Sequence, residues 1–199
     1  MSTIFKPVPL TVNSDQVTCR AHNLETCFTC DLDFSLLNQL YKNLKTIDGR
    51  IPASPAANPN LSTQINRLKE EGNKNFRAQN YAEAIKLYSL AVDMAFQRPV
   101  WESFAAAKED ISVCLCNRAQ AYIDSGAWVD AYVDSVAVVK MRWDWSKGHF
   151  RMGKALMGLK RYDEAIEAFK LGSNIEPQSE EIKTALKDAE DLISQSQKD

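Results

Sequence analysis

The chain has 199 residues, and its 24 basic and 26 acidic side chains give a formal net charge of −2. Hydrophobic residues make up 45% of the chain and charged residues 25%, a balance typical of folded globular proteins that excludes wholesale disorder. Because the charges nearly cancel, we expect no overall attraction to nucleic acid or to anionic lipid. No apolar run approaches the roughly 18 residues of a membrane span, so no direct span is expected.

The first residues and the cysteines bear on the cellular compartment. The segment MSTIFKPVPLTV contains Pro7 and Pro9 and no long apolar run, so we do not expect it to act as a signal peptide. The chain has five cysteines, an odd number, which favours a reducing, cytoplasmic environment over a disulfide scaffold.

Residues 1–47 are predicted to form a small α+β segment. Three short runs rich in β-branched and aromatic residues, separated by polar turns, predict short strands. The stretch that follows predicts an amphipathic helix whose apolar stripe consists of Phe34, Leu37, Leu40 and Leu44. A segment of about fifty residues is too short to form a hydrophobic core that is stable by itself. We therefore expect this apolar stripe to dock on a partner protein.

A proline-rich stretch, residues 48–63, follows this segment. Pro52, Pro55 and Pro59 fall within DGRIPASPAANPNLST. Proline lacks a backbone N–H, and its ring clashes with the preceding turn of a helix. This stretch is therefore predicted to be a linker or strap rather than a helix or a central strand.

The remainder of the chain, residues 64–199, repeats. An aromatic residue precedes an alanine by three positions in three copies: Tyr81/Ala84, Trp128/Ala131 and Tyr162/Ala165. A small residue precedes each of these alanines by twelve positions: Gly72, Ala119 and Gly153. The second and third copies are 34 residues apart, whereas the first and second are 47 apart. The extra residues, around FQRPVWESFAAAKED, are predicted to lengthen the helix and loop between the first two copies.

This pattern resembles the tetratricopeptide repeat (TPR), a helix–turn–helix unit of about 34 residues. Small residues at matched positions let paired helices approach closely, and aromatic residues fill the space between neighbouring repeats. The resemblance implies a mainly α fold with three repeats wound as a right-handed superhelix. A last apolar stripe predicts a C-terminal helix that caps the stack and consists of Ile182, Leu186, Ala189 and Ile193.

Polar residues recur on the first helix of each repeat, which in TPR proteins lines a concave groove. Lys69 and Asn73 are four residues apart in the first repeat, as are Lys147 and Arg151 in the third, so each pair shares a helix face. Asn117 lies on the first helix of the second repeat. Lysine and arginine pair with carboxylates, and asparagine offers a peptide both a donor and an acceptor. These residues suit a small anionic target.

The five residues resemble the carboxylate clamp of chaperone-binding TPR proteins. The resemblance implies a ligand with the Glu-Glu-Val-Asp type of C-terminus found on cytosolic heat-shock chaperones. The seventy-kilodalton class is the first candidate and the ninety-kilodalton class the second. Phe76, one turn beyond Asn73, is a candidate wall for the ligand's apolar residue.

A second group of residues, near the N-terminus, has the spacing C-x2-H-x4-C-x2-C and consists of Cys19, His22, Cys27 and Cys30. Zinc sites use such ligands, but the separation between the two ligand pairs is normally longer than four residues. We therefore interpret the cysteines as structural thiols and expect no metal and no other cofactor. A zinc site and a thiol-redox pair within residues 19–30 are the alternatives.

The layout of the whole chain is similar to the small cytosolic TPR subunits of the fungal Sec complex, which serves post-translational import into the endoplasmic reticulum (ER). The shared features are the β-rich start, the proline-rich strap and RPVWESFA in the insertion. The resemblance implies a protein peripheral on the cytosolic face of the ER membrane. Its N-terminal segment would dock on a membrane-anchored Sec subunit while the repeats bind the chaperone. A free cytosolic co-chaperone linking heat-shock chaperones is the alternative.

The sequence does not indicate an enzyme. It contains no recognisable nucleophile–base pair and no glycine-rich phosphate loop. The residues outside the repeats are also too few for a typical catalytic domain. We expect an adapter without catalytic residues.

Overall fold

The structure is a computed structural model that describes residues 10–13, 16–46, 58–99, 102 and 104–196. The chain divides into two compact units, which are taken separately below. The N-terminal unit comprises residues 1–56 and 99–102, and the repeat unit comprises residues 57–98 and 103–199. Within the described ranges, none of the helices combines the length and the apolar content needed to cross a bilayer.

The N-terminal unit contains two small antiparallel sheets and one helix. Strand β1 (Leu10–Val12) pairs with β2 (Val17–Cys19), and β3 (Thr26–Cys27) pairs with β4 (Leu32–Asp33). Helix α1 (Ser35–Thr46) follows directly. The predicted order of short strands followed by one amphipathic helix is confirmed.

A buried asparagine attaches helix α1 to these strands. The Asn38 side chain is 0% exposed, and its Oδ1 accepts a hydrogen bond from Val17 N at 2.6 Å. Its Nδ2 donates to Val17 O and to Glu25 Oε1, both at 2.9 Å. Because a buried amide is costly without partners, this network specifies how the helix packs on β2.

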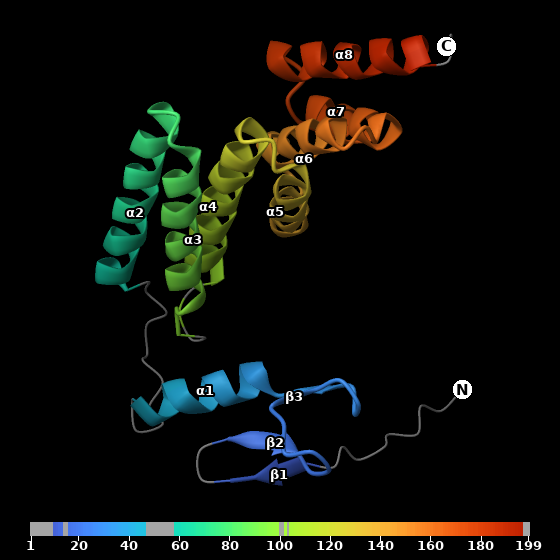
Figure 1. Cartoon of the computed structure of the whole chain (residues 1–199). Helices are drawn as coiled ribbons and strands as arrows, with labels where there is room; N and C mark the ends of the chain where they lie inside the picture. Colours follow the sequence, from blue (N-terminus) through green and yellow to red (C-terminus); the bar gives the residue numbers. More distant parts are fainter. Residues whose placement is uncertain (1–9, 14–15, 47–57, 100–101, 103, 197–199) are drawn as a thin grey trace. The chain divides into compact units, whose positions relative to one another are not determined.

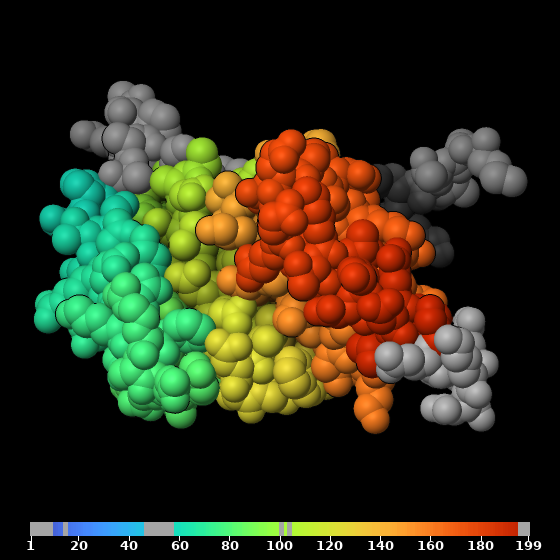
Figure 2. Space-filling view, turned by 90° about the horizontal axis from the view of Figure 1, so that it is seen from above, coloured from blue at the N-terminus to red at the C-terminus, as the bar shows by residue number. Residues whose placement is uncertain are grey.

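The repeat unit contains seven helices in the part of the chain that the structure describes. They are α2 (Pro59–Arg77), α3 (Tyr81–Phe96), α4 (Phe104–Asp124), α5 (Trp128–Met141), α6 (Ser146–Gly158), α7 (Tyr162–Ile175) and α8 (Glu180–Ser196). Each helix packs on its neighbours along the chain, and α4 also contacts both α2 and α6. The repeats therefore follow one another in sequence order across the unit, from the teal helices to the red cap (Figures 1 and 2). Three helix–turn–helix repeats and a capping helix confirm the predicted mainly α fold.

The small residues of the repeat pattern permit close packing of paired helices. A Cβ atom on Gly72 would lie 2.6 Å from Tyr88 Cε1 on the second helix of the repeat. A Cβ on Gly153 would overlap the Phe169 ring in the same way two repeats later. The close approach of paired helices at these small residues is as predicted, but the rings that fill the space are Tyr88 and Phe169, which the repeat pattern did not select.

Helix α2 begins within the stretch predicted to be a strap. Residues 47–57 lie outside the described residues, but Pro59 is already helical. Asn58 caps the helix, since its side chain accepts hydrogen bonds from Asn60 N at 3.0 Å and Leu61 N at 3.4 Å. Proline is well tolerated in a first turn because an N–H there would have no helical partner. The prediction that Pro59 excludes a helix is wrong for this reason.

The insertion between the first two repeats lengthens a helix. Helix α4 has 21 residues, whereas the equivalent α6 has 13. This outcome agrees with the predicted lengthening.

Candidate functional site

The five residues of the predicted clamp and the candidate wall residue Phe76 all lie on the first helices of the repeats. Lys69, Asn73 and Phe76 are on α2, and Asn117 is on α4. Lys147 and Arg151 are on α6. Since α4 contacts both α2 and α6, the three helices form one continuous surface.

Four of these six residues line one pocket of about 130 Å³, whose walls are Asn73, Phe76, Tyr88, Asn117, Gln120 and Arg151. Lys147 lines a second pocket of about 100 Å³ together with Arg151, Glu176 of the α7–α8 connection and Glu181 of α8. Lys69 lines neither pocket. The structure thus brings the two amides, the arginine and the phenylalanine together, with the two lysines to the sides.

The amides are oriented by a tyrosine that the sequence analysis did not select. The Tyr88 hydroxyl donates to Asn73 Oδ1 at 2.7 Å, and Asn117 Nδ2 donates to the same oxygen at 3.2 Å. Burial raises the pKa of Tyr88 to about 12, so its hydroxyl keeps the proton that it donates. Asn73 Nδ2 donates to Glu70 Oε2 at 3.4 Å, which leaves this amide one further N–H for a ligand, and Asn117 keeps its carbonyl oxygen as an acceptor.

Arg151 is a half-buried cation without a carboxylate partner among the described residues. Its Nε is buried and has no hydrogen-bond partner there. By contrast, Arg118 pairs with Asp134 through hydrogen bonds of 2.7 and 2.8 Å. A guanidinium held partly out of water without a counterion favours the binding of an anion, because the anion restores the missing interactions.

Cations from both flanks act on the same stretch of α4. Burial raises the pKa of the Cys114 thiol to about 11, and the positive charge of Lys69 opposes this rise. Burial also raises the pKa of Cys116, where Arg151 and Lys147 oppose the rise. Since both cysteines are on α4, positive charge from α2 and from α6 converges on the helix that carries Asn117.

An apolar wall closes one side of the pocket. The Phe76 ring packs against the Tyr81 ring, with 5.6 Å between their centres, and both side chains are half-buried. Phe76 also packs against the cluster of Ala84, Tyr88 and Ala121. The pocket therefore offers an apolar contact next to its polar donors.

The surface beside the capping helix has the opposite character. A larger pocket between α4, α6 and α8 is lined by two cations, Arg151 and Lys154, and by four carboxylates: Asp124, Glu180, Glu181 and Asp188. These carboxylates disfavour an anionic ligand at the α8 side. The part of the groove that suits an anion is therefore the part between α2 and α6.

In the N-terminal unit, the predicted docking stripe is only partly exposed. Leu37 is 47% exposed, whereas Phe34, Leu40 and Leu44 are half-buried. The neighbouring Leu36, which the spacing argument did not select, is 75% exposed.

The four metal-type residues of the N-terminal unit also come together. The ligand atoms of Cys19, His22, Cys27 and Cys30 all lie within 4.8 Å of one another. The short separation between the two pairs, which argued against a metal in the sequence, does not keep them apart.

Sequence reasoning missed Tyr88 and Gln120 in the groove. Gln120 is one turn beyond Asn117, so helical spacing alone was sufficient to find it. Tyr88 is on a second helix, and only its close approach to Gly72 brings its hydroxyl to the groove.

Comparison with known proteins agrees with this architecture. Residues 146–179 match the family model of the tetratricopeptide repeat. The chain is 40% identical over 123 residues to the ER protein translocation subcomplex subunit sec67 of Schizosaccharomyces pombe. This match covers 61% of the present chain and 64% of that protein.

Solved structures share the fold. A chain in the cryo-EM structure of the Sec complex from S. cerevisiae has a TM-score of 0.76 at 22% identity and covers 94% of this chain and 98% of that chain. The first TPR domain of Spaghetti (RPAP3), bound to the HSP90 peptide SRMEEVD, has a TM-score of 0.57 at 26% identity. That likeness covers 67% of this chain and 95% of the RPAP3 chain.

Proposed function

We propose that the groove of this tetratricopeptide-like repeat unit binds the free acidic C-terminus of a cytosolic heat-shock chaperone. In this role the protein is an adapter and carries out no chemical reaction. The ligand is a tail of the Glu-Glu-Val-Asp type, with the seventy-kilodalton class as the first candidate.

The observation that carries this proposal is the polar pocket between α2, α4 and α6. It combines a half-buried Arg151 without a carboxylate partner in the described chain, the oriented amides of Asn73 and Asn117, and the apolar Phe76. A peptide C-terminus presents a carboxylate, backbone amides and apolar side chains within a few ångströms, which is the chemistry these groups complement. The RPAP3 domain, which has the same fold, is bound to a peptide that ends in EEVD.

We further propose that the adapter belongs to the ER translocation machinery, peripheral on the cytosolic face of the membrane. Its similarity to sec67 and the fold that it shares with a chain of the Sec complex support this role. The N-terminal unit would then dock on a membrane-anchored Sec subunit, and the exposed side chains of Leu36 and Leu37 are suited to such a contact.

Titration calorimetry tests the groove. A peptide ending in Glu-Glu-Val-Asp should bind the full chain with a Kd of about 1–100 μM, because a short flexible peptide loses entropy on binding. Its C-terminally amidated form should bind at least about tenfold more weakly, since it lacks the terminal charge. Equal affinity for the two peptides would contradict the proposal.

Affinity capture tests the attachment. The tagged full chain, incubated with cytosol and with detergent-solubilised microsomes, should retain both the chaperone and Sec subunits. Retention of the chaperone without any Sec subunit would instead indicate a free cytosolic co-chaperone.

A further inference from the structure

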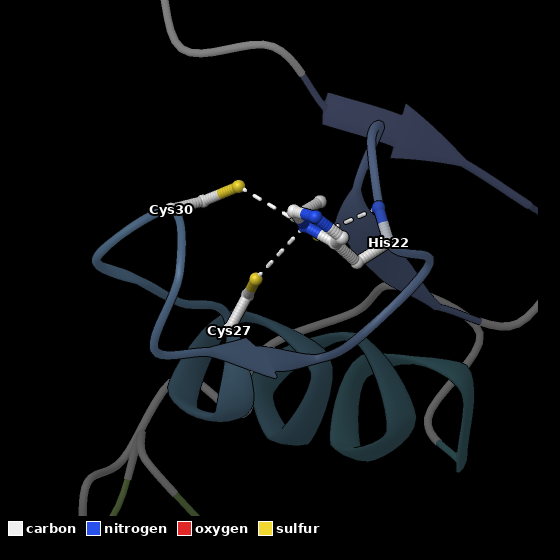
Figure 3. Close-up of side chains that lie close together, drawn as sticks. His22, Cys27 and Cys30 are labelled. Carbon is white, nitrogen blue, oxygen red and sulfur yellow. Dashed lines mark hydrogen bonds between the residues drawn. The ribbon is translucent and has the colours of Figure 1, made fainter.

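The N-terminal unit holds its three cysteines and one histidine around a single point. His22 Nδ1 lies 3.8 Å from Cys19 Sγ and 3.3 Å from both Cys27 Sγ and Cys30 Sγ. In Figure 3 the sulfur atoms of Cys27 and Cys30 point at the imidazole ring. All three cysteines are free thiols.

These distances fit the edges of a coordination tetrahedron. Zinc bonds of about 2.3 Å to sulfur and about 2.0–2.1 Å to nitrogen place the nitrogen and each sulfur about 3.6 Å apart at a tetrahedral angle. The three observed distances lie on either side of this value. A set of three thiolates and one imidazole favours zinc over harder cations such as magnesium or calcium.

The backbone forms two similar turns that deliver the ligands. Cys19 ends β2 and Cys27 ends β3, and the second ligand of each pair follows three residues later. Asn23 and Asp31, the residues directly after these second ligands, have left-handed backbones with φ of 55° and 53°. In the first turn His22 N donates to Cys19 Sγ at 3.3 Å, an interaction that favours a thiolate.

The interior of this unit contains little else that could stabilise it. Its buried residues, among those described, are Thr18, Cys19, Cys27 and Asn38. No large apolar side chain is among them. Small domains that cannot build an apolar core usually depend on a disulfide or a metal. Thiols that only fill space pack among apolar side chains, whereas these face one another and an imidazole.

We propose that Cys19, His22, Cys27 and Cys30 bind one Zn²⁺ ion in a closed structural site that holds the N-terminal unit together. The bound ion joins the end of β2, the end of β3 and both turns. It is independent of the peptide groove, which belongs to the repeat unit.

Metal analysis of the full chain, purified without chelators, tests this site. Elemental analysis should find about one zinc per chain. The Cys27→Ser/Cys30→Ser variant should lose the zinc, whereas Cys114→Ala, which removes a buried thiol of the repeat unit, should keep it. Zinc-free full chain, or zinc retained by the double variant, would overturn the proposal. So would a Cys27–Cys30 disulfide in place of the metal, which would instead identify a redox pair.

Histidine variants separate coordination from a general loss of structure. His22→Cys restores a fourth ligand with similar reach and should keep the metal, whereas His22→Ala should release it more readily to a competing chelator. After exchange with Co²⁺, the full chain should show the visible absorption of a tetrahedral thiolate site, and His22→Cys should shift that spectrum. An identical spectrum for the two chains would show that His22 is not a ligand.

Discussion

The Tyr88 hydroxyl donates a hydrogen bond to Asn73 Oδ1 across 2.7 Å, from the second helix of the first repeat to the first. Together with the bond that Asn117 Nδ2 donates to the same oxygen, it fixes Oδ1 as the acceptor end of the Asn73 amide and leaves Nδ2 as the donor end. A residue in the packing between two helices therefore sets the polarity of the candidate binding site.

Tyr88→Phe removes this bond and leaves the ring in place. We expect the affinity for the acidic peptide to fall several-fold and the free energy of unfolding to fall by about 0.5–1.5 kcal/mol, the usual net value of one hydrogen bond. Tyr162→Phe, at the start of α7, is the matched control and should change neither. Calorimetry and chemical denaturation measure the two effects. Unchanged peptide binding in Tyr88→Phe would show that the amide does not need this bond.

Arg151 should contribute more to peptide binding than a surface cation. Arg151→Ala should weaken binding by about 1.5–3 kcal/mol, the range of a charge-assisted hydrogen bond, or roughly ten- to a hundredfold. Arg151→Lys should give an intermediate affinity, since an ammonium keeps the charge but not the planar pair of donors. Lys140→Ala, an exposed cation on α5, serves as the control for net charge. An equal loss of peptide affinity in Lys140→Ala would show that Arg151 acts only through the net charge of the protein.

Ionic strength should affect the two parts of the pocket differently. In the proposed complex the peptide carboxylates would contact Lys69 and Arg151, which are half-buried, and Lys147, which is exposed. Such contacts are screened by salt, since the Debye length is only about 8 Å at physiological ionic strength. Affinity for the peptide should therefore fall as salt rises, while the apolar contact with Phe76 persists. Calorimetry across a salt series measures the slope. Binding that does not respond to salt would indicate a mainly apolar groove and another class of ligand.

Two glycines should respond differently to substitution by alanine. Gly72→Ala places a methyl group 2.6 Å from the Tyr88 ring and should cost about 1–3 kcal/mol of stability. Gly172→Ala meets its nearest neighbours at 3.4–3.5 Å and should be neutral or stabilising by up to about 1 kcal/mol, because alanine favours a helix. Thermal unfolding followed by circular dichroism compares them. Equal melting temperatures for the two variants would contradict the packing argument.

The two units should separate by function. A fragment that begins at Asn58 keeps the cap of α2 and all seven described helices of the repeat unit, so it should fold and bind the peptide while losing the Sec subunits. A full chain with Lys147→Ala and Arg151→Ala should behave in the opposite way. If the fragment still retained Sec subunits to the same extent, docking through the N-terminal unit would be wrong.

Much of this molecule can be predicted from its sequence because the information is local and repeated. The spacing of Tyr81, Ala84 and Gly72, repeated in later copies, specifies paired helices that pack closely, and each helix then presents a known face. The first helices and their groove residues follow from that periodicity. The start of α2 does not follow from the periodicity. Pro59 would break a helix at an interior position but is favourable in the first turn, and Asn58 caps that turn.

What the sequence determines by itself is thus the repeat, the helices and which polar side chains share a face. Tertiary structure alone decides which groups come together across elements: Tyr88 bonds to Asn73, Arg151 lines one pocket with the two amides, and His22 lies among the three thiols. The physical reason is that the residues on one helix face are three or four positions apart in the sequence. Contacts between separate elements depend instead on how those elements pack together. The ligand spacing near the N-terminus argues against a metal, yet folding brings all four ligand atoms within 4.8 Å of one another.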